Sequence, residues 1–200
     1  MVTSVTNGDA WNEEGRLALD FVNYEVASRI GISESFESPA PLAGWLDAAR
    51  GSDLGATHAL GLPDHRTLMS EARRLGSEMR RLFRAVARAE PIPAETLFTV
   101  NRAIDSGRPR SRLVVADGAP VVETVHAAET PLAMLAPIAL AAAELVAHAD
   151  PRRLRQCAGE DCAAWFLDTS KGGQRRWCSM ARCGNRSKAA RYRRRHATVE

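Results

Sequence analysis

Four cysteines occur near the end of this chain, in two pairs that have the same spacing. The pairs are Cys157-x4-Cys162 and Cys178-x4-Cys183, and they account for every cysteine of the 200 residues. Four thiolates form the donor set of a tetrahedral structural zinc site, which two tight knuckles can supply from opposite sides of the ion. The sequence therefore predicts one structural Zn²⁺ per chain, bound by these four cysteines.

Two other uses of paired cysteines fit the sequence less well. Disulfides belong to oxidising compartments, and the residues after Met1 have neither the basic start nor the apolar core of a secretory signal. A redox dithiol favours a Cys-x-x-Cys spacing at the start of a helix, which the chain lacks. We therefore expect a cytoplasmic protein with reduced cysteines.

The segment between the two pairs must return the chain to the metal. Ala163–Asp168 is apolar and indicates a short strand, residues 169–174 have the composition of a turn, and Arg175–Trp177 indicates a returning strand. We expect a hairpin between the two knuckles. Asp168 is expected to hold a turn or to pair with an arginine.

Aromatic side chains are concentrated in this part of the chain. In so small a module they are expected to form its core, with stacking on nucleic-acid bases as the alternative. The residues concerned are Trp165, Phe166, Trp177 and Tyr192.

Charge divides the chain into two parts. Residues 151–200 hold thirteen Lys or Arg against four Asp or Glu, a net charge of +9, whereas residues 1–150 hold fourteen against twenty, a net charge of −6. This asymmetry predicts two domains, 1–150 and 151–200, and a polyanionic partner for the basic one. The longest apolar stretch, Leu132 to Ala147, contains Pro137 and Glu144 and is too short to cross a bilayer, so no membrane partner is expected.

The first domain is expected to be mainly helical. Five helices are predicted: Arg16–Arg29, Leu42–Arg50, Asp64–Ala89, Ala94–Ile104 and Thr130–Ala149. For the first, a strand over Leu17–Phe21 is the alternative. The last is expected to be capped by Thr130 and to kink or restart at Pro137. In the third of these, apolar residues recur at spacings of four and three and predict a buried stripe: Leu68, Ala72, Leu75, Met79, Leu82 and Val86.

One β-hairpin is predicted in the same domain. Asp117-Gly118 separates Arg112–Val115 from Pro120–Val125, which is a strong signal for a two-residue turn. The predicted fold class is α+β, mainly α: a helical N-terminal domain with one β-hairpin, followed by a small four-cysteine zinc-binding module of zinc-ribbon or treble-clef-like type that ends in a basic helix.

The sequence offers no catalytic constellation. Its five histidines are scattered, and it contains neither a phosphate-binding glycine loop nor a nucleophile elbow. We predict no catalytic residues and a function in binding.

Residues 153–196 resemble the CGNR zinc finger, which is named for the tetrapeptide that begins at Cys183. The resemblance also rests on Trp165–Asp168, Arg176–Ser179, Lys188 and the Tyr-Arg-x-Arg sequence at 192–195. The sequence Leu-Ala-Leu-Asp-Phe-Val-Asn at 17–23 is similar to the start of the ABATE domain, which precedes this finger in bacterial proteins. The resemblance implies a zinc-binding, DNA-binding protein among the stress-induced transcription regulators.

A basic helix is expected after the last cysteine, with Gly184 allowing a tight turn and Asn185 as its cap. The candidate nucleic-acid-binding residues are Arg175, Arg176, Arg186, Lys188, Arg191, Arg193, Arg194 and Arg195. The expected partner is duplex DNA, and the N-terminal domain is expected to sense a small-molecule effector or to form a homodimer. The alternatives are an adaptor that binds an acidic protein and an RNA-binding protein.

Overall fold

The helical body is organised around the long helix α3 (His65–Ala87). Five of the six residues of its predicted stripe, Leu68, Ala72, Leu75, Met79 and Leu82, are each at most 3% exposed, and the sixth, Val86, is partly buried against the same core. The computed structural model describes residues 11–29, 42, 65–125 and 130–196. Within this part of the chain the stripe packs against the other helices of the same body, which agrees with an internal core.

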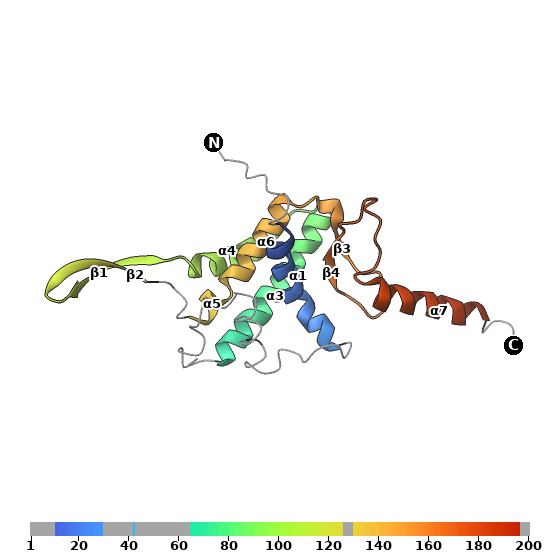
Figure 1. Cartoon of the computed structure of the whole chain (residues 1–200), viewed down its shortest axis with the longest axis horizontal. Helices are drawn as coiled ribbons and strands as arrows, with labels where there is room; N and C mark the ends of the chain where they lie inside the picture. Colours follow the sequence, from blue (N-terminus) through green and yellow to red (C-terminus); the bar gives the residue numbers. More distant parts are fainter. Residues whose placement is uncertain (1–10, 30–41, 43–64, 126–129, 197–200) are drawn as a thin grey trace.

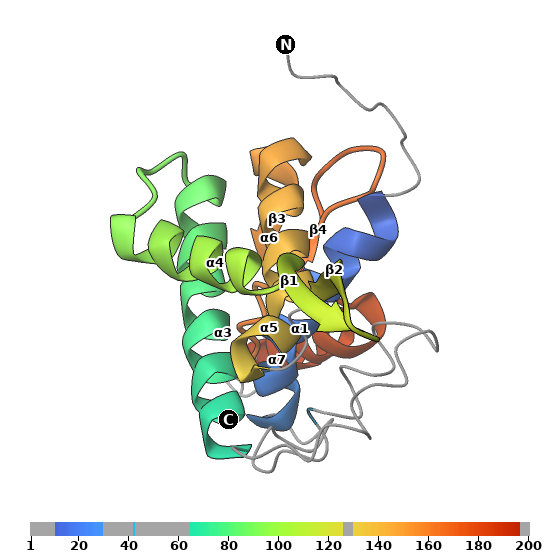
Figure 2. The same cartoon turned by 90° about the vertical axis from the view of Figure 1, so that its left-hand side faces the viewer.

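Four further helices complete the described body. They are α1 (Trp11–Arg29), α4 (Ala94–Ser106), α5 (Pro131–Met134) and α6 (Ala136–His148). Helix α1 packs against α6, and α4 crosses α3 and α6 (Figure 2). The helix predicted at Arg16–Arg29 is confirmed, and the alternative strand is wrong. Of the helix predicted at Leu42–Arg50, only Leu42 is described, as a core residue, and the rest lies outside the described residues.

The helix predicted from Thr130 to Ala149 forms in two pieces. The Thr130 hydroxyl accepts a hydrogen bond of 3.2 Å from the Ala133 amide and so caps α5, as predicted. Leu135 separates α5 from α6, and Pro137 lies in the first turn of α6. Proline has no amide hydrogen and its ring collides with the carbonyl four residues earlier, so the chain restarts the helix here.

The predicted hairpin consists of β1 (Arg110–Ala116) and β2 (Ala119–Val125). Leu113 faces Val122 in the antiparallel register. The turn residues Asp117 and Gly118 have φ angles of 52° and 79°, the left-handed pair that Asp-Gly accommodates in a type I′ turn. This hairpin extends away from the body, at the opposite end from the C-terminal helix (Figure 1).

The C-terminal module contains a second hairpin, whose pairing differs from the prediction. Its elements are η1 (Pro151–Arg153), β3 (Leu154–Gln156), β4 (Trp165–Leu167), η2 (Met180–Gly184) and α7 (Asn185–His196). Strand β4 pairs with β3, which precedes the first cysteine pair, and residues 175–177 form no strand. The hairpin therefore encloses the first knuckle and does not lie between the two knuckles.

Strand β4 joins two hydrophobic cores. Adjacent side chains of a strand point to opposite faces, and Trp165 enters the core of the body while Phe166 packs with the cysteines. The Trp165 ring meets the edge of Phe83 in α3, with 5.9 Å between centroids. The expectation that Trp165 builds the core of the module itself is wrong, because the alternation directs it to the body. Phe166 and Trp177 do pack around the cysteine cluster, as predicted.

A side chain of α1 completes this junction. The Asn23 amide nitrogen donates to the Trp165 carbonyl at 2.7 Å, and the Trp165 amide donates to the Asn23 carboxamide oxygen at 2.7 Å. The carboxamide thus pairs with both backbone groups of Trp165, as a neighbouring strand would. It links positions 142 residues apart in the sequence.

Among the described residues, no helix is both long enough and apolar enough to cross a membrane.

Replacing Asn23 with Ala is expected to lower the free energy of unfolding by about 2 kcal/mol, since each of its two hydrogen bonds contributes about 1 kcal/mol. Urea unfolding followed by circular dichroism measures the change. Asn101→Ala, on an exposed position of α4, is the matched control and should change stability by less than about 0.5 kcal/mol. Equal effects of the two substitutions would contradict the assigned role of Asn23.

Candidate metal centre and basic helix

The first cysteine pair occupies the loop that joins β3 to β4. The Cys157 amide donates to the Ala164 carbonyl at 2.8 Å, which extends the ladder of the hairpin, and the Cys162 amide donates to the Gly159 carbonyl at 3.1 Å, which closes a tight turn. These two bonds fold residues 157–162 back on themselves. Both thiols are buried as a result.

The second pair lies at the start of the C-terminal helix. The Ser179 hydroxyl accepts from the Arg182 amide, and the Ser179 carbonyl accepts from the Cys183 amide at 2.9 Å and the Gly184 amide at 3.1 Å. This wide π-type turn, η2, leads directly into α7. Cys183 is therefore part of the first helical turn. Because a helix start and not a pair of strands carries the second pair, the module is of the treble-clef-like type.

Two details of this helix start differ from the predictions. Asn185 is not the cap: its φ and ψ of −67° and −40° are helical, and its side chain donates to the Ala181 carbonyl at 3.2 Å. Ser179 is the cap because the helical turns already begin at Met180. Gly184 has no left-handed φ, and a Cβ atom there would lie 2.4 Å from the Met180 sulfur. Close packing, and not a tight turn, accounts for this glycine.

The four sulfur atoms lie within 4.8 Å of one another. The Cys162 and Cys178 sulfurs are 3.8 Å apart, and those of Cys178 and Cys183 are 3.7 Å apart. A Zn–S bond of about 2.3 Å in tetrahedral geometry places sulfurs about 3.8 Å apart, so the cluster has the dimensions of a zinc site. All four cysteines are free of disulfides. The donor set and its geometry both fit one zinc ion.

The clustering of the thiols affects their ionisation. Burial, together with the neighbouring Cys157 thiol, raises the pKa of Cys178, and burial raises the pKa of Cys183 to about 11. Burial also acts on Cys157, but amide hydrogen bonds outweigh it and lower the pKa of that thiol. One of these donors is the Cys178 amide, whose nitrogen lies 3.4 Å from the Cys157 sulfur. A bound cation, which requires thiolates, displaces the protons that the metal-free cluster retains.

Asp168 organises the loop that leads to the second pair, as predicted. Its fully buried carboxylate accepts hydrogen bonds from the Ser170 hydroxyl at 2.6 Å, the Ser170 amide at 3.0 Å and the Arg175 amide at 2.7 Å. The Ser170 hydroxyl, more than any other group, lowers the pKa of Asp168. Because these donors turn toward the carboxylate, the chain at 175–177 bends around Asp168 instead of forming the predicted strand.

All eight basic residues predicted to bind nucleic acid are exposed. Two of them also have contacts within the module. The Arg175 guanidinium lies over the Phe166 ring, 5.3 Å from its centroid, and donates to the Cys178 carbonyl at 2.7 Å. The Arg176 guanidinium lies 5.2 Å from the centre of the Trp177 ring. These two arginines stabilise the second knuckle, whatever else they contact.

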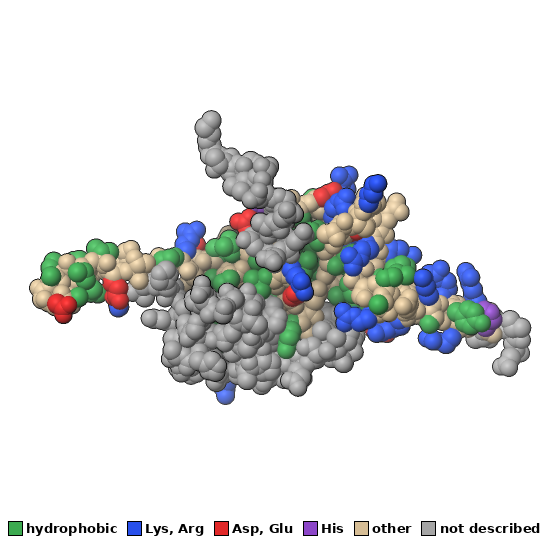
Figure 3. Space-filling view, in the orientation of Figure 1, with side chains coloured by type: hydrophobic (Ala, Val, Ile, Leu, Met, Phe, Trp, Pro, Cys, Tyr) green, Lys and Arg blue, Asp and Glu red, His purple; other side chains and the backbone are tan. Residues whose placement is uncertain are grey.

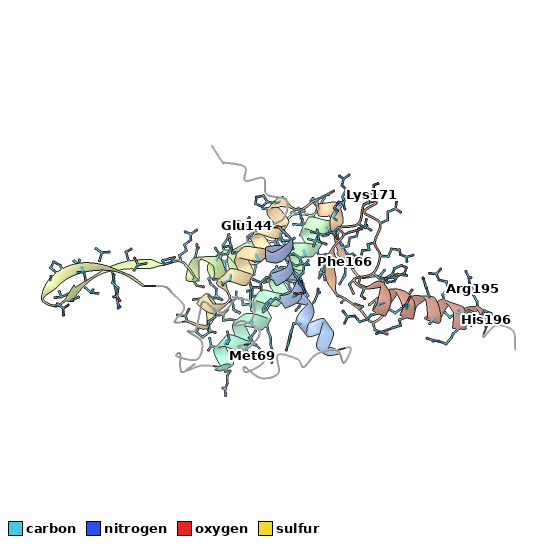
Figure 4. The ribbon with its side chains drawn as sticks, in the orientation of Figure 1. Met69, Glu144, Phe166, Lys171, Arg195 and His196 are labelled. Carbon is cyan, nitrogen blue, oxygen red and sulfur yellow. The ribbon has the colours of Figure 1, made fainter. Side chains whose placement is uncertain are left out.

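The remaining six lie on α7, which has no buried residue. The helix points away from the body, and Lys and Arg side chains cover much of it (Figure 3). Arg195 and His196 lie near its free end (Figure 4). Tyr192 is 64% exposed and stacks on the His196 ring at 4.0 Å, so its predicted place in the module core is wrong.

One side of α7 faces the first knuckle across a cleft of about 290 Å³. From the helix, the cleft is lined by Arg186, Ser187, Ala190, Arg191 and Arg194. From the knuckle, Glu160 forms an ion pair of 2.9 Å with the Arg194 guanidinium. Arg176, Asp161 and the two cysteines Cys162 and Cys183 also line the cleft. The arginines on this side of α7 therefore lie over the cysteine cluster.

Several residues that position the site were not predicted from the sequence. Leu154 begins β3 and enters the body core, but three residues are too few for a recognisable strand pattern. Asn23 has the sequence character of an ordinary polar residue of its helix. Its sequence signal is its place at the end of the Leu-Ala-Leu-Asp-Phe-Val-Asn motif at 17–23, which does not indicate a partner at Trp165.

The fold and the site define a class of protein: a helical body that carries a four-cysteine metal module and an exposed basic helix. Comparison with family models agrees with this class. Residues 15–149 match the ABATE family, described as "Putative stress-induced transcription regulator", and residues 153–196 match the CGNR zinc finger. The chain belongs to the ABATE family and ends in a CGNR zinc finger. No curated protein matches the chain.

The family and the sulfur geometry together show that the protein holds one structural zinc ion. The description of one family names a zinc finger and that of the other names a transcription regulator, and neither description names a catalysed reaction.

Zinc removal is expected to destabilise the body as well as the module, because Leu154 and Trp165 belong to the body core. Structural zinc in finger peptides contributes roughly 10–16 kcal/mol, so Cys183→Ser should unfold the module and reduce bound zinc below one per chain. Metal analysis under reducing conditions and thermal unfolding with and without a chelator test this. Ser187→Ala, in the same cleft, should retain the metal. If the chelator leaves the unfolding midpoint of the body unchanged, the coupling between zinc binding and the stability of the body is refuted.

Proposed function

We propose that this protein is a DNA-binding transcription regulator in which Cys157, Cys162, Cys178 and Cys183 ligate zinc and α7 contacts duplex DNA. One observation carries the proposal: six Lys or Arg side chains lie on a helix that has no buried residue and begins at the metal cluster. A helix of this diameter fits the major groove of B-DNA. Its 12 residues extend about 18 Å, enough to follow the groove across several base pairs.

The two sides of α7 differ in their electrostatic surroundings. Four thiolates and one Zn²⁺ carry a net charge of −2, and Arg186, Arg191 and Arg194 line the cleft beside the cysteines. Glu160 adds a further negative charge to this side. The cleft arginines therefore compensate local negative charge, which weakens their attraction for phosphates.

The opposite side of α7, called the outer face, carries Lys188 and Arg195, which are seven residues apart and so lie close together around the helix. Tyr192 follows Lys188 by four residues and lies next to them. Arg193 follows Arg186 by seven residues and so lies beside it, away from Lys188, but it does not line the cleft either. None of the three basic residues lines the cleft. We assign this outer face as the primary contact surface for phosphates.

The triple variant Lys188→Ala, Arg193→Ala, Arg195→Ala tests the basic residues of α7 that lie outside the cleft. Each lost phosphate contact lowers the slope of log K against log salt concentration by about 0.9, so the slope should fall by up to about 2.7 on duplex DNA. Fluorescence anisotropy over a range of salt concentrations measures it. The matched control removes three exposed arginines from α3, Arg66, Arg73 and Arg84, and should leave the slope unchanged. If only the control variant reduces the salt slope, the phosphate contact surface lies on α3 and not on α7.

Tyr192 distinguishes duplex DNA from single-stranded RNA. Stacking on an unpaired base contributes about 1–3 kcal/mol, whereas paired bases in a duplex do not offer their faces. Tyr192→Leu is therefore expected to leave duplex affinity within about twofold of the unaltered protein, with RNA the weaker competitor. Direct competition between the two nucleic acids provides the measurement. If the unaltered protein prefers RNA and Tyr192→Leu removes that preference, the protein binds RNA and the DNA proposal is wrong.

A further inference from the structure

The β1–β2 hairpin, residues 110–125 and called the arm from here on, has the most exposed large apolar side chains of the described chain. Leu113, Val115 and Val122 are 73%, 75% and 71% exposed. No described residue of the arm belongs to the buried core of the body. The arm extends from the body with apolar side chains along it (Figures 1 and 3).

The two faces of the arm differ in character. Cross-strand partners share a face, and residues two apart on one strand return to it. One face contains only uncharged residues, here called the apolar face: Ser111, Leu113, Val115, Pro120, Val122 and Thr124. The other face carries the ion pair of Arg112 and Glu123, at 3.0 Å, and the less exposed Val121 at 41%. The three large apolar side chains of the arm that are more than 70% exposed therefore all lie on the apolar face.

This arrangement requires a covering surface. A two-stranded hairpin is marginally stable in water unless a further element packs on it. Exposed contiguous apolar surface usually marks an interaction site. The apolar face has no charge with which to attract a nucleic acid or a charged peptide, so its partner must itself be apolar and uncharged.

We propose that the apolar face is a self-association surface that packs on the same face of a second copy of this chain. Every copy presents the same uncharged face, and a two-fold axis brings two identical patches together. Each face is about 24 Å long, and two such faces packed together bury on the order of 800 Å² in total. This area lies below that of permanent dimers, so the dimer is weak and depends on protein concentration.

Sedimentation analysis of the full-length zinc-loaded protein, without nucleic acid and under reducing conditions, tests the proposal. The average mass should rise from 21.7 kDa toward twice that value as the concentration increases. Leu113→Glu places a carboxylate in the centre of the interface and should raise the dissociation constant by about tenfold or more. Val122→Glu, its cross-strand partner, should act in the same way.

The matched control is Val121→Glu, which adds the same charge one position away but on the opposite face. It should leave the dissociation constant close to that of the unaltered protein. Zinc content and circular dichroism verify that the body remains folded in each variant. A monomer at all concentrations overturns the proposal, and so does an equal loss of dimer in Val121→Glu and Leu113→Glu. Neither result bears on DNA binding through α7, which the salt dependence measures separately.

Discussion

The alternation of side chains along β4 holds the two parts of this protein together. Trp165 and Phe166 are neighbours in the sequence, yet one belongs to the core of the helical body and the other to the metal cluster. A three-residue strand has little stability of its own. It persists because both of its faces are covered, and truncating a buried aromatic side chain of this kind costs about 3–5 kcal/mol. The orientation of everything beyond Cys162 follows from this junction.

The zinc–thiolate cluster and the arginines of the module carry charges of opposite sign. The net charge of +9 for residues 151–200 treats the cysteines as neutral, and four thiolates with one Zn²⁺ lower it to +7. The positive charge that remains is concentrated on a helix of 12 residues with no buried side chain, a length at which isolated helices are marginal in water. The Ser179 cap and Cys183 fix its start, and the basic residues of its last turn interact favourably with the helix dipole.

Sequence patterns predicted the parts of this structure that depend on local regularity. The cysteine spacing identified the metal cluster, the four-and-three spacing from Leu68 identified α3, and Asp117-Gly118 identified the arm. The parts that depend on contacts between distant residues were not predictable in this way. Strand β3 has only three residues, and the loop at 168–175 takes its shape from one buried carboxylate.

The misassigned residues have a similar explanation. An aromatic side chain in a small module is usually part of its core, but Trp165 has the body beside it and Tyr192 lies on a helix that has no buried residue. Composition alone does not distinguish these surroundings. For Asn185, the preference of asparagine for helix caps favoured one position, while the π-type turn that begins after Ser179 had already started the helix.

The pairing of Asn23 with Trp165 has an evolutionary consequence. A finger of this kind grafted onto an unrelated body would expose the Trp165 ring and deprive its amide and carbonyl of the partners that Asn23 provides. A body without the finger would lose part of the surface that covers Phe83. Recombination between these two segments is therefore disfavoured unless both sides of the junction are inherited together.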